Sequence, residues 1–117
     1  MNLDYKLSKE EHERIFKGLV EELENTTTSV DNPEIVVLGG QPGCGKGGLI
    51  KLSAQQFING NAAIINGDEY RKEHPQSREI FQKYEQKYAE LTDPDVREWT
   101  SNLFAHAINT KRNIIFE

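Results

Sequence analysis

A glycine-rich segment that follows an apolar run carries the residues best suited to chemistry. It reads Gly40-Gln41-Pro42-Gly43-Cys44-Gly45-Lys46-Gly47 and comes directly after residues 35–38. Glycines let successive backbone N–H groups turn toward phosphate oxygens, and the N-terminus of a following helix adds positive potential. A lysine at this spacing reaches the outer phosphates of a nucleoside triphosphate. The segment predicts a phosphate-binding loop, with the nucleotide contacted by Gly40, Gln41, Pro42, Gly43, Cys44, Gly45, Lys46, Gly47 and Gly48.

The position after the lysine departs from this pattern. A Ser or Thr normally stands there and offers its hydroxyl to Mg²⁺, whereas this chain has Gly47. We therefore assign no metal ligand and expect a weakened magnesium-dependent step. A glycine-rich turn with a solvated lysine is the alternative interpretation. The flanking strand and helix patterns disfavour it.

A second polar segment follows the apolar run 62–66 and includes Asp68, Glu69 and Arg71. In open α/β sheets the carboxyl ends of the strands border the ligand crevice, so Asp68 would face the phosphate-binding loop. There it could take a proton from a hydroxyl that attacks the γ-phosphate. In isolation, Gly-Asp-Glu at a strand end is more typical of a helix cap. Arg71 either pairs with substrate phosphates or lies on a solvated helix surface, and we favour the second placement.

The overall composition limits the possible partners. The 117 residues carry a formal net charge of −5, contain one cysteine and include no apolar run near 20 residues. An acidic chain is poorly suited to nucleic acid or anionic membranes, and one cysteine makes no disulfide framework. We expect a cytoplasmic protein that binds neither nucleic acid nor membrane. The chain is short for a complete phosphate-loop kinase, so we expect a shortened kinase core.

The spacing of apolar residues predicts the elements that position these segments. Ser8 and Glu11 form a capping box before an amphipathic helix that runs to about residue 24. Its apolar face comprises Ile15, Phe16, Leu19, Val20 and Leu23. A polar linker, 25–33, separates this helix from the rest, so we divide the chain into 1–33, helix and linker, and 34–117, the kinase core of a single domain.

Strands and helices alternate in the predicted core. The apolar runs 35–38, 62–66 and 113–117 predict buried strands, and a helix over 46–58 joins the first two, with Leu49, Leu52 and Phe57 on its apolar face. Another helix starts with Asp93 as N-cap and Pro94 at its first position. Before it, a helix starts near Gln76 and carries the apolar residues Ile80, Phe81, Tyr84, Tyr88 and Leu91. Trp99 is assigned to core packing. The order predicts an α/β fold, a three-layer α/β/α arrangement like that of P-loop NTPases with a mostly parallel sheet, preceded by the amphipathic helix.

Three blocks of this sequence resemble the zeta toxin family of phosphate-loop kinases. They are Gly39-Gly40-Gln41-Pro42-Gly43-x-Gly45-Lys46, Asn66-Gly67-Asp68-x-Tyr70-Arg71-x-x-His74-Pro75 and Asn113-Ile114-Ile115-Phe116-Glu117. The resemblance covers about the first half of a family member. Family members carry Ser or Thr in place of Gly47 and continue after the third block with Gly-Thr and with arginines that contact phosphates.

The resemblance implies a reaction and a set of roles. The family transfers the γ-phosphate of ATP, with Mg²⁺, to the 3′-hydroxyl of a UDP-N-acetylamino sugar and is neutralised by a small helical antitoxin. By position, Lys46 resembles the phosphate lysine and Asp68 the base that activates the sugar hydroxyl. Asp68, Glu69, Arg71 and the strand-end acid Glu117 would contact the sugar nucleotide.

Several interpretations stay open at this point. The absence of the phosphate-contacting arginines predicts a weak or inactive kinase. One such arginine can raise the rate of phosphoryl transfer by a factor of about 10³–10⁵. The nucleotide is ATP or GTP. Another phosphate-loop kinase of small molecules would share the nucleotide site, and a non-catalytic remnant would bind an antitoxin without turnover. A last strand short of neighbours would expose a sheet edge and favour self-association.

Overall fold

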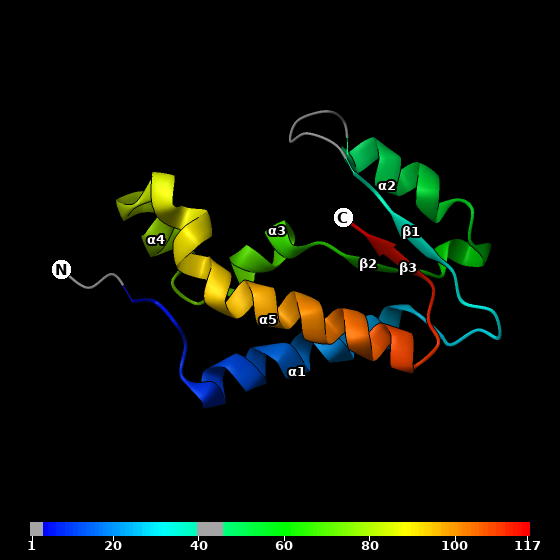
Figure 1. Ribbon diagram of the computed structural model, residues 1–117, viewed down its shortest axis with the longest axis horizontal. Coiled ribbons are helices and arrows are strands. Elements are labelled where there is room, and N and C mark those ends of the chain that lie inside the picture. The colour runs from blue at the N-terminus through cyan, green and yellow to red at the C-terminus, as the bar shows by residue number, and fades with distance from the viewer. Residues whose placement is uncertain (1–3, 40–45) are drawn as a thin grey trace.

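The computed structural model describes residues 4–39 and 46–117, and of residues 46–49 it describes the backbone alone. One helix precedes the first strand, one lies between the first and second strands, and three lie between the second and third strands (Figure 1). The elements are α1 (Lys9–Thr26), β1 (Ile35–Val37), α2 (Lys46–Ala54), β2 (Ala63–Ile65), α3 (Gly67–Tyr70), α4 (Ser77–Lys83), α5 (Tyr88–Asn109) and β3 (Ile114–Phe116), with single 3₁₀ turns at Ile58–Gly60, Arg71–Glu73 and Glu85–Lys87.

The three strands form a parallel sheet in the order β1-β3-β2. Ile114 of β3 lies opposite Ile35 of β1 and Ala63 of β2. The expectation that the last strand lacks neighbours is therefore wrong. Ile114 and Ile115 are fully buried, and a strand that is apolar on both faces is most stable at the centre of a parallel sheet. The outer edges belong to β1 and β2.

Helices cover both faces of the sheet, which confirms the three-layer α/β/α arrangement. Helices α1 and α5 lie side by side on one face, and α2 covers the other (Figure 1). Leu19 and Leu23 of α1 share a core with Trp99 and Leu103 of α5 and with Ile114 of β3. The N-terminal helix is thus part of the main hydrophobic core.

The predicted start of α1 is confirmed. The Ser8 hydroxyl accepts a hydrogen bond from the backbone N–H of Glu11 at 3.3 Å, which satisfies one of the unpaired donors of the first turn. The helix ends at Thr26, two residues later than predicted. Thr27 then donates its hydroxyl to the Leu23 carbonyl at 2.6 Å, and Arg112 donates to that hydroxyl at 2.9 Å.

The predicted boundary at Asp93 and Pro94 is wrong, because α5 begins at Tyr88 and passes through Pro94. Proline cannot donate to the carbonyl one turn earlier, which normally disfavours a helix interior. The carbonyl that loses its helical donor is that of Glu90. In the same turn, the Thr92 hydroxyl donates to the Tyr88 carbonyl at 2.8 Å and Arg71 donates to the Ala89 carbonyl at 3.0 Å. A continuous buried stripe spans the proline and comprises Thr92, Asp95, Val96, Trp99, Leu103 and Ala107.

Two other helices, α4 and α2, are shorter than predicted. Helix α4 stops at Lys83, so Tyr84 and Tyr88 do not extend its apolar face. Helix α2 stops at Ala54, and Leu52 is largely exposed. Phe57 is buried, but it lies beyond the helix, where it packs with Ala62 and Ile115. Leu49 belongs to the part of α2 whose side chains are not described.

Candidate functional site

The candidate site lies at the carboxyl edge of the parallel sheet. Asn66 follows β2 and Glu117 follows β3, while the phosphate-loop segment comes between β1 and α2. The predicted nucleotide contacts from Gly40 to Gly45 lie outside the described residues. Lys46, Gly47 and Gly48 form the first turn of α2, whose backbone N–H groups have no intrahelical partner. An anion such as a phosphate fits that end of the helix.

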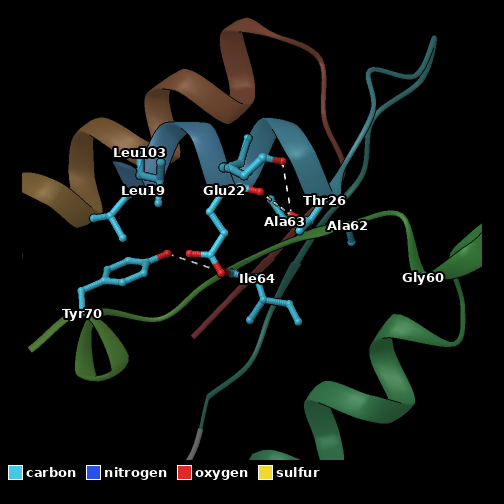
Figure 2. A pocket seen from close by; sticks show the side chains of 10 residues that line it. Leu19, Glu22, Thr26, Gly60, Ala62, Ala63, Ile64, Tyr70 and Leu103 are labelled. Carbon is cyan, nitrogen blue, oxygen red and sulfur yellow. Dashed lines mark hydrogen bonds between the residues drawn. The ribbon is translucent and has the colours of Figure 1, made fainter. Parts of the chain in front are cut away.

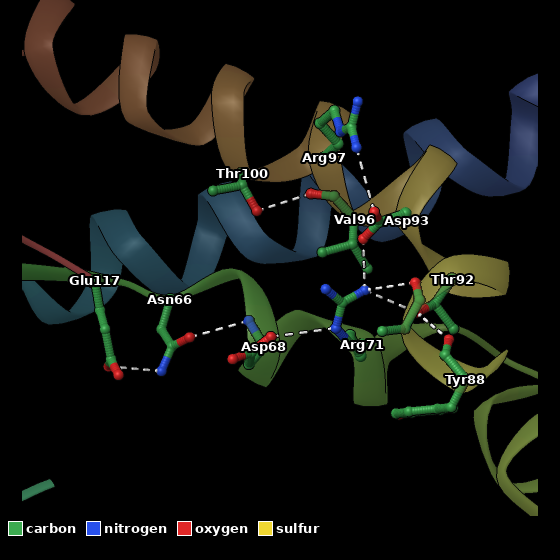
Figure 3. A network of polar contacts seen from close by, with 11 residues as sticks. Asn66, Asp68, Arg71, Tyr88, Thr92, Asp93, Val96, Arg97, Thr100 and Glu117 are labelled. Atoms are coloured by element: carbon green, nitrogen blue, oxygen red, sulfur yellow. Dashed lines mark hydrogen bonds and ion pairs between the residues drawn. The ribbon is translucent and has the colours of Figure 1, made fainter. Parts of the chain in front are cut away.

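Asn66 links the ends of two strands. Its side-chain amide donates to the Glu117 carboxylate at 2.9 Å, and its side-chain oxygen accepts from the backbone N–H of Asp68 at 3.0 Å (Figure 3). The backbone N–H of Glu117 in turn donates to the Ile65 carbonyl at 3.1 Å. Asn66 therefore holds Glu117 and the start of α3 together.

Asp68 presents its carboxylate to solvent at this edge. The side chain is 83% exposed, and one oxygen accepts a hydrogen bond from Arg71 Nε at 3.3 Å. The alternative in which Gly-Asp-Glu caps a helix is wrong for Asp68, because Asn66 is the N-cap of α3. The Asp68 carboxylate is thus not used in capping and can accept a proton from a bound hydroxyl group.

Arg71 connects this edge to α5. Its Nη1 atom donates to Asp93 Oδ1 at 2.8 Å, to the Thr92 hydroxyl at 3.0 Å and to the Ala89 carbonyl at 3.0 Å (Figure 3). The side chain is only 16% exposed, so the favoured placement on a solvated helix surface is wrong. Because Arg71 also contacts Asp68, it fixes that acid relative to α5.

Glu69 lies apart from this network. Its carboxylate is 3.4 Å from Lys72 Nζ, and both side chains are mostly exposed. The structure therefore brings Asn66, Asp68, Arg71 and Glu117 together and leaves Glu69 outside. Sequence reasoning assigned Asn66 no role, although it stands in one of the three motif blocks and immediately after a predicted strand.

A separate groove lies between α1 and the outer edge of β2. It has a volume of about 380 Å³, and Glu22, Ile64 and Tyr70 are among its lining residues (Figure 2). The Tyr70 hydroxyl donates to the Ile64 carbonyl at 3.4 Å. Burial raises the pKa of Tyr70 to about 12, and the nearby Glu22 carboxylate adds to this effect. Tyr70 is therefore neutral at physiological pH.

Residues 4–39 and 46–117 contain no group of three or more His, Cys, Asp or Glu side chains arranged to hold a metal ion. In the same part of the chain, no helix has the length and hydropathy needed to cross a bilayer.

Comparisons with known proteins agree on one family. Residues 17–117 match the family model described as Zeta toxin. A Toxin zeta of Streptococcus agalactiae is 28% identical over 93% of this chain and 37% of that protein. The Toxin PezT of Streptococcus pneumoniae serotype 4 is 30% identical over 76% of this chain and 35% of that protein. The chain thus spans little more than a third of these relatives.

The fold matches a solved structure over the whole chain. A chain from the PezAT chromosomal toxin-antitoxin system of Streptococcus pneumoniae superposes with a TM-score of 0.88 and 26% sequence identity. The match covers 100% of this chain and 48% of the solved one.

Proposed function

This chain belongs to the zeta toxin family, and from that premise we propose that it forms the nucleotide-binding part of an ATP-dependent kinase. The proposed acceptor is the 3′-hydroxyl of a UDP-N-acetylamino sugar. The observation that carries the proposal is the strand-end network, in which Asn66 holds Glu117 and Arg71 contacts Asp68. This places a solvent-facing carboxylate at the sheet edge where the phosphate-loop segment also begins.

Each residue has a proposed task. Lys46 and the start of α2 bind the triphosphate, and Asp68 accepts the proton of the attacking hydroxyl. Glu117, held by Asn66, and Arg71 help to position the acceptor. When bound, Mg²⁺ would neutralise charge on the phosphates; since Gly47 has no hydroxyl, water and phosphate oxygens would supply its ligands.

Calorimetry with ATP or GTP tests the nucleotide site. We expect nucleotide binding that is weakened about tenfold or more by Lys46→Ala, because the lysine supplies the main local positive charge. We also expect that Gly47→Ser strengthens binding only when Mg²⁺ is present, because the hydroxyl restores a metal ligand. Lys51→Ala, on the same helix, is the matched control. No binding by the wild type or the serine variant would contradict the proposal.

Single-turnover phosphate transfer tests the acceptor. With a UDP-N-acetylamino sugar we expect transfer that is slow or near background, because Gly47 offers no hydroxyl to Mg²⁺. Asp68→Asn should abolish whatever transfer remains, whereas Glu69→Gln should retain it. Faster phosphate transfer to a different hydroxyl compound than to the UDP-N-acetylamino sugar would indicate another small-molecule kinase.

A second function is binding of a small helical antitoxin. It is favoured by Gly47, which has no hydroxyl to offer Mg²⁺, and by the PezAT system to which the solved relative belongs. A pull-down with the antitoxin of the PezAT system separates the two functions, because a non-catalytic remnant binds that antitoxin and shows no transfer. We propose a cytoplasmic location for either function.

A further inference from the structure

His74 is a buried side chain to which the proposed function gives no task. It is 1% exposed and directly follows the 3₁₀ turn Arg71–Glu73. Its backbone N–H donates to the Arg71 carbonyl at 3.3 Å, which closes that turn. A polar ring buried this fully needs hydrogen-bonding partners, because burial removes it from water. The partners of the His74 ring therefore show what holds the turn in place.

Both ring nitrogens of His74 are hydrogen-bonded to backbone groups. The backbone N–H of Gln76 donates to Nδ1 at 3.1 Å, so Nδ1 is an acceptor and carries no proton. Nε2 then carries the ring proton and donates it to the carbonyl of Tyr5 at 2.8 Å. The first bond is local. The second joins residues 69 positions apart in the chain and ties the end of the turn to the N-terminal segment.

The carbonyl of Tyr5 belongs to the segment that precedes α1, residues 4–8, which we call the N-terminal strap (Figure 1). The backbone N–H of Leu7 donates to Asp95 Oδ2 at 3.0 Å, and Asp95 is a fully buried residue of α5. The Tyr5 ring lies against the ring of Tyr84, which follows α4, with the ring centroids 6.3 Å apart. The N-terminal strap is thus held at two residues and offers the Tyr5 carbonyl from a defined position.

The turn that His74 ends carries a residue of the candidate site. Arg71 begins the turn, and its Nε atom donates to Asp68 Oδ1 at 3.3 Å. Within residues 4–39 and 46–117, no other side chain donates a hydrogen bond to the Asp68 carboxylate. Helix α5 holds the far end of the Arg71 guanidinium through Asp93. The direction of the Asp68 carboxylate therefore depends on where the turn holds Arg71.

We propose that His74 is a positioning residue for the acceptor site, which acts through Arg71 on Asp68. Its bond to the Tyr5 carbonyl holds the end of the turn, so the N-terminal strap controls the position of the carboxylate that accepts the proton. This positioning role rests on the function proposed for Asp68. Because the contact between Arg71 and Asp68 is measured without phosphate transfer, an inactive chain would contradict the proposed reaction alone.

The nuclear magnetic resonance signal of the Arg71 Nε–H group tests this in the 117-residue chain. Asp68→Asn should shift the signal and speed its exchange with water, because the Nε–H group would lose a charged acceptor. His74→Gln keeps a side-chain N–H long enough to reach the Tyr5 carbonyl and should retain the wild-type signal. His74→Asn keeps an acceptor for Gln76 but is too short to reach Tyr5, so exchange should be about tenfold or more faster.

Two further variants complete the experiment. A chain without residues 1–6 lacks the Tyr5 carbonyl and should match His74→Asn. Leu103→Ala is the control for lost stability, because it opens a cavity in the core about two turns along α5 from Asp95, and it should keep the wild-type signal. Wild-type exchange in His74→Asn or in the shortened chain, equal exchange in His74→Gln and His74→Asn, no effect of Asp68→Asn, or faster exchange in Leu103→Ala would overturn the proposal.

Discussion

At the scale of single residues, the candidate site depends on a side chain that performs no chemistry itself. Asn66 uses both ends of its amide, with the oxygen capping α3 and the nitrogen bound to Glu117. A carboxylate could cap the helix but could not donate to Glu117, and a hydroxyl is too short to reach both. The two contacts explain why asparagine suits this position.

Substitution of Asn66 separates the two contacts. Asn66→Ala removes both and should lower the free energy of unfolding by about 1 kcal/mol through loss of the cap. Asn66→Ser retains a capping oxygen and should recover most of that loss, although it cannot reach Glu117. Urea unfolding measures each value. Equal stability of the alanine variant and the wild type would show that the cap does not contribute.

Ionisation of Tyr70 makes the free energy of unfolding depend on pH in the alkaline range. Burial raises its pKa to about 12, whereas a tyrosine in an unfolded chain titrates near 10. Above pH 10 the unfolded state ionises while the folded state keeps its proton. The stabilisation is therefore complete below pH 10 and is lost as the pH rises through about 12.

Comparison with Tyr70→Phe isolates this effect, because phenylalanine does not ionise. Between pH 9 and pH 11.5 the wild type should lose about 2 kcal/mol more of its unfolding free energy than the variant. Lysine deprotonation affects both proteins and cancels in the difference. Parallel decreases in both proteins would contradict the role of Tyr70.

At the scale of elements, buried polar contacts attach the N-terminal segment to α5. Asp95, which is fully buried, accepts from His12 Nδ1 at 2.6 Å and from the backbone N–H of Leu7 at 3.0 Å. Trp99 donates its indole N–H to the His12 carbonyl at 3.1 Å and stacks on the His12 ring at 5.3 Å. These contacts fix the position of α1 against α5.

Replacement of Asp95 tests this attachment. Asp95→Ala leaves the Leu7 N–H and the His12 ring without their acceptor and should destabilise the fold by about 3 kcal/mol. Glu98, 61% exposed and 3.6 Å from the other nitrogen of His12, is the control. Glu98→Ala should cost less than about 1 kcal/mol. Similar losses in both variants would argue against a special role for the buried carboxylate.

At the scale of the whole molecule, the N-terminal helix and the sheet share one core. Leu19 and Leu23 pack in the cluster that contains Trp99, Leu103 and Ile114. Removal of residues 1–33 would expose the apolar stripe of α5 to water. A division at residue 33 therefore separates segments of sequence and not units of folding.

A deletion tests this statement. We expect that residues 34–117 alone do not unfold cooperatively, because much of the core would be solvent-exposed. The full chain should show a single transition when followed by the fluorescence of its one tryptophan. A cooperative transition in the shortened chain would show that residues 34–117 fold independently.

Some features of this protein follow from local patterns in the sequence. The N-cap at Ser8, the apolar stripe of α1, the three strands and the burial of Trp99 are confirmed, since each depends on residues a few positions apart. The phosphate-loop spacing predicts the nucleotide site in the same way, and that site stays a prediction.

Other features arise only from contacts between distant segments. Local spacing in the sequence does not predict these features, because they depend on residues far apart in the chain. They are the central place of β3, the continuation of α5 through Pro94, the hydrogen bond from Arg71 to Asp93 and the hydrogen bond from Asn66 to Glu117. Each is decided by which side chains can be buried and hydrogen-bonded together once the layers pack. Local propensity determines which segments form helices and strands. The burial of apolar side chains and the hydrogen bonding of buried polar groups determine how those helices and strands are ordered and which of them make contact.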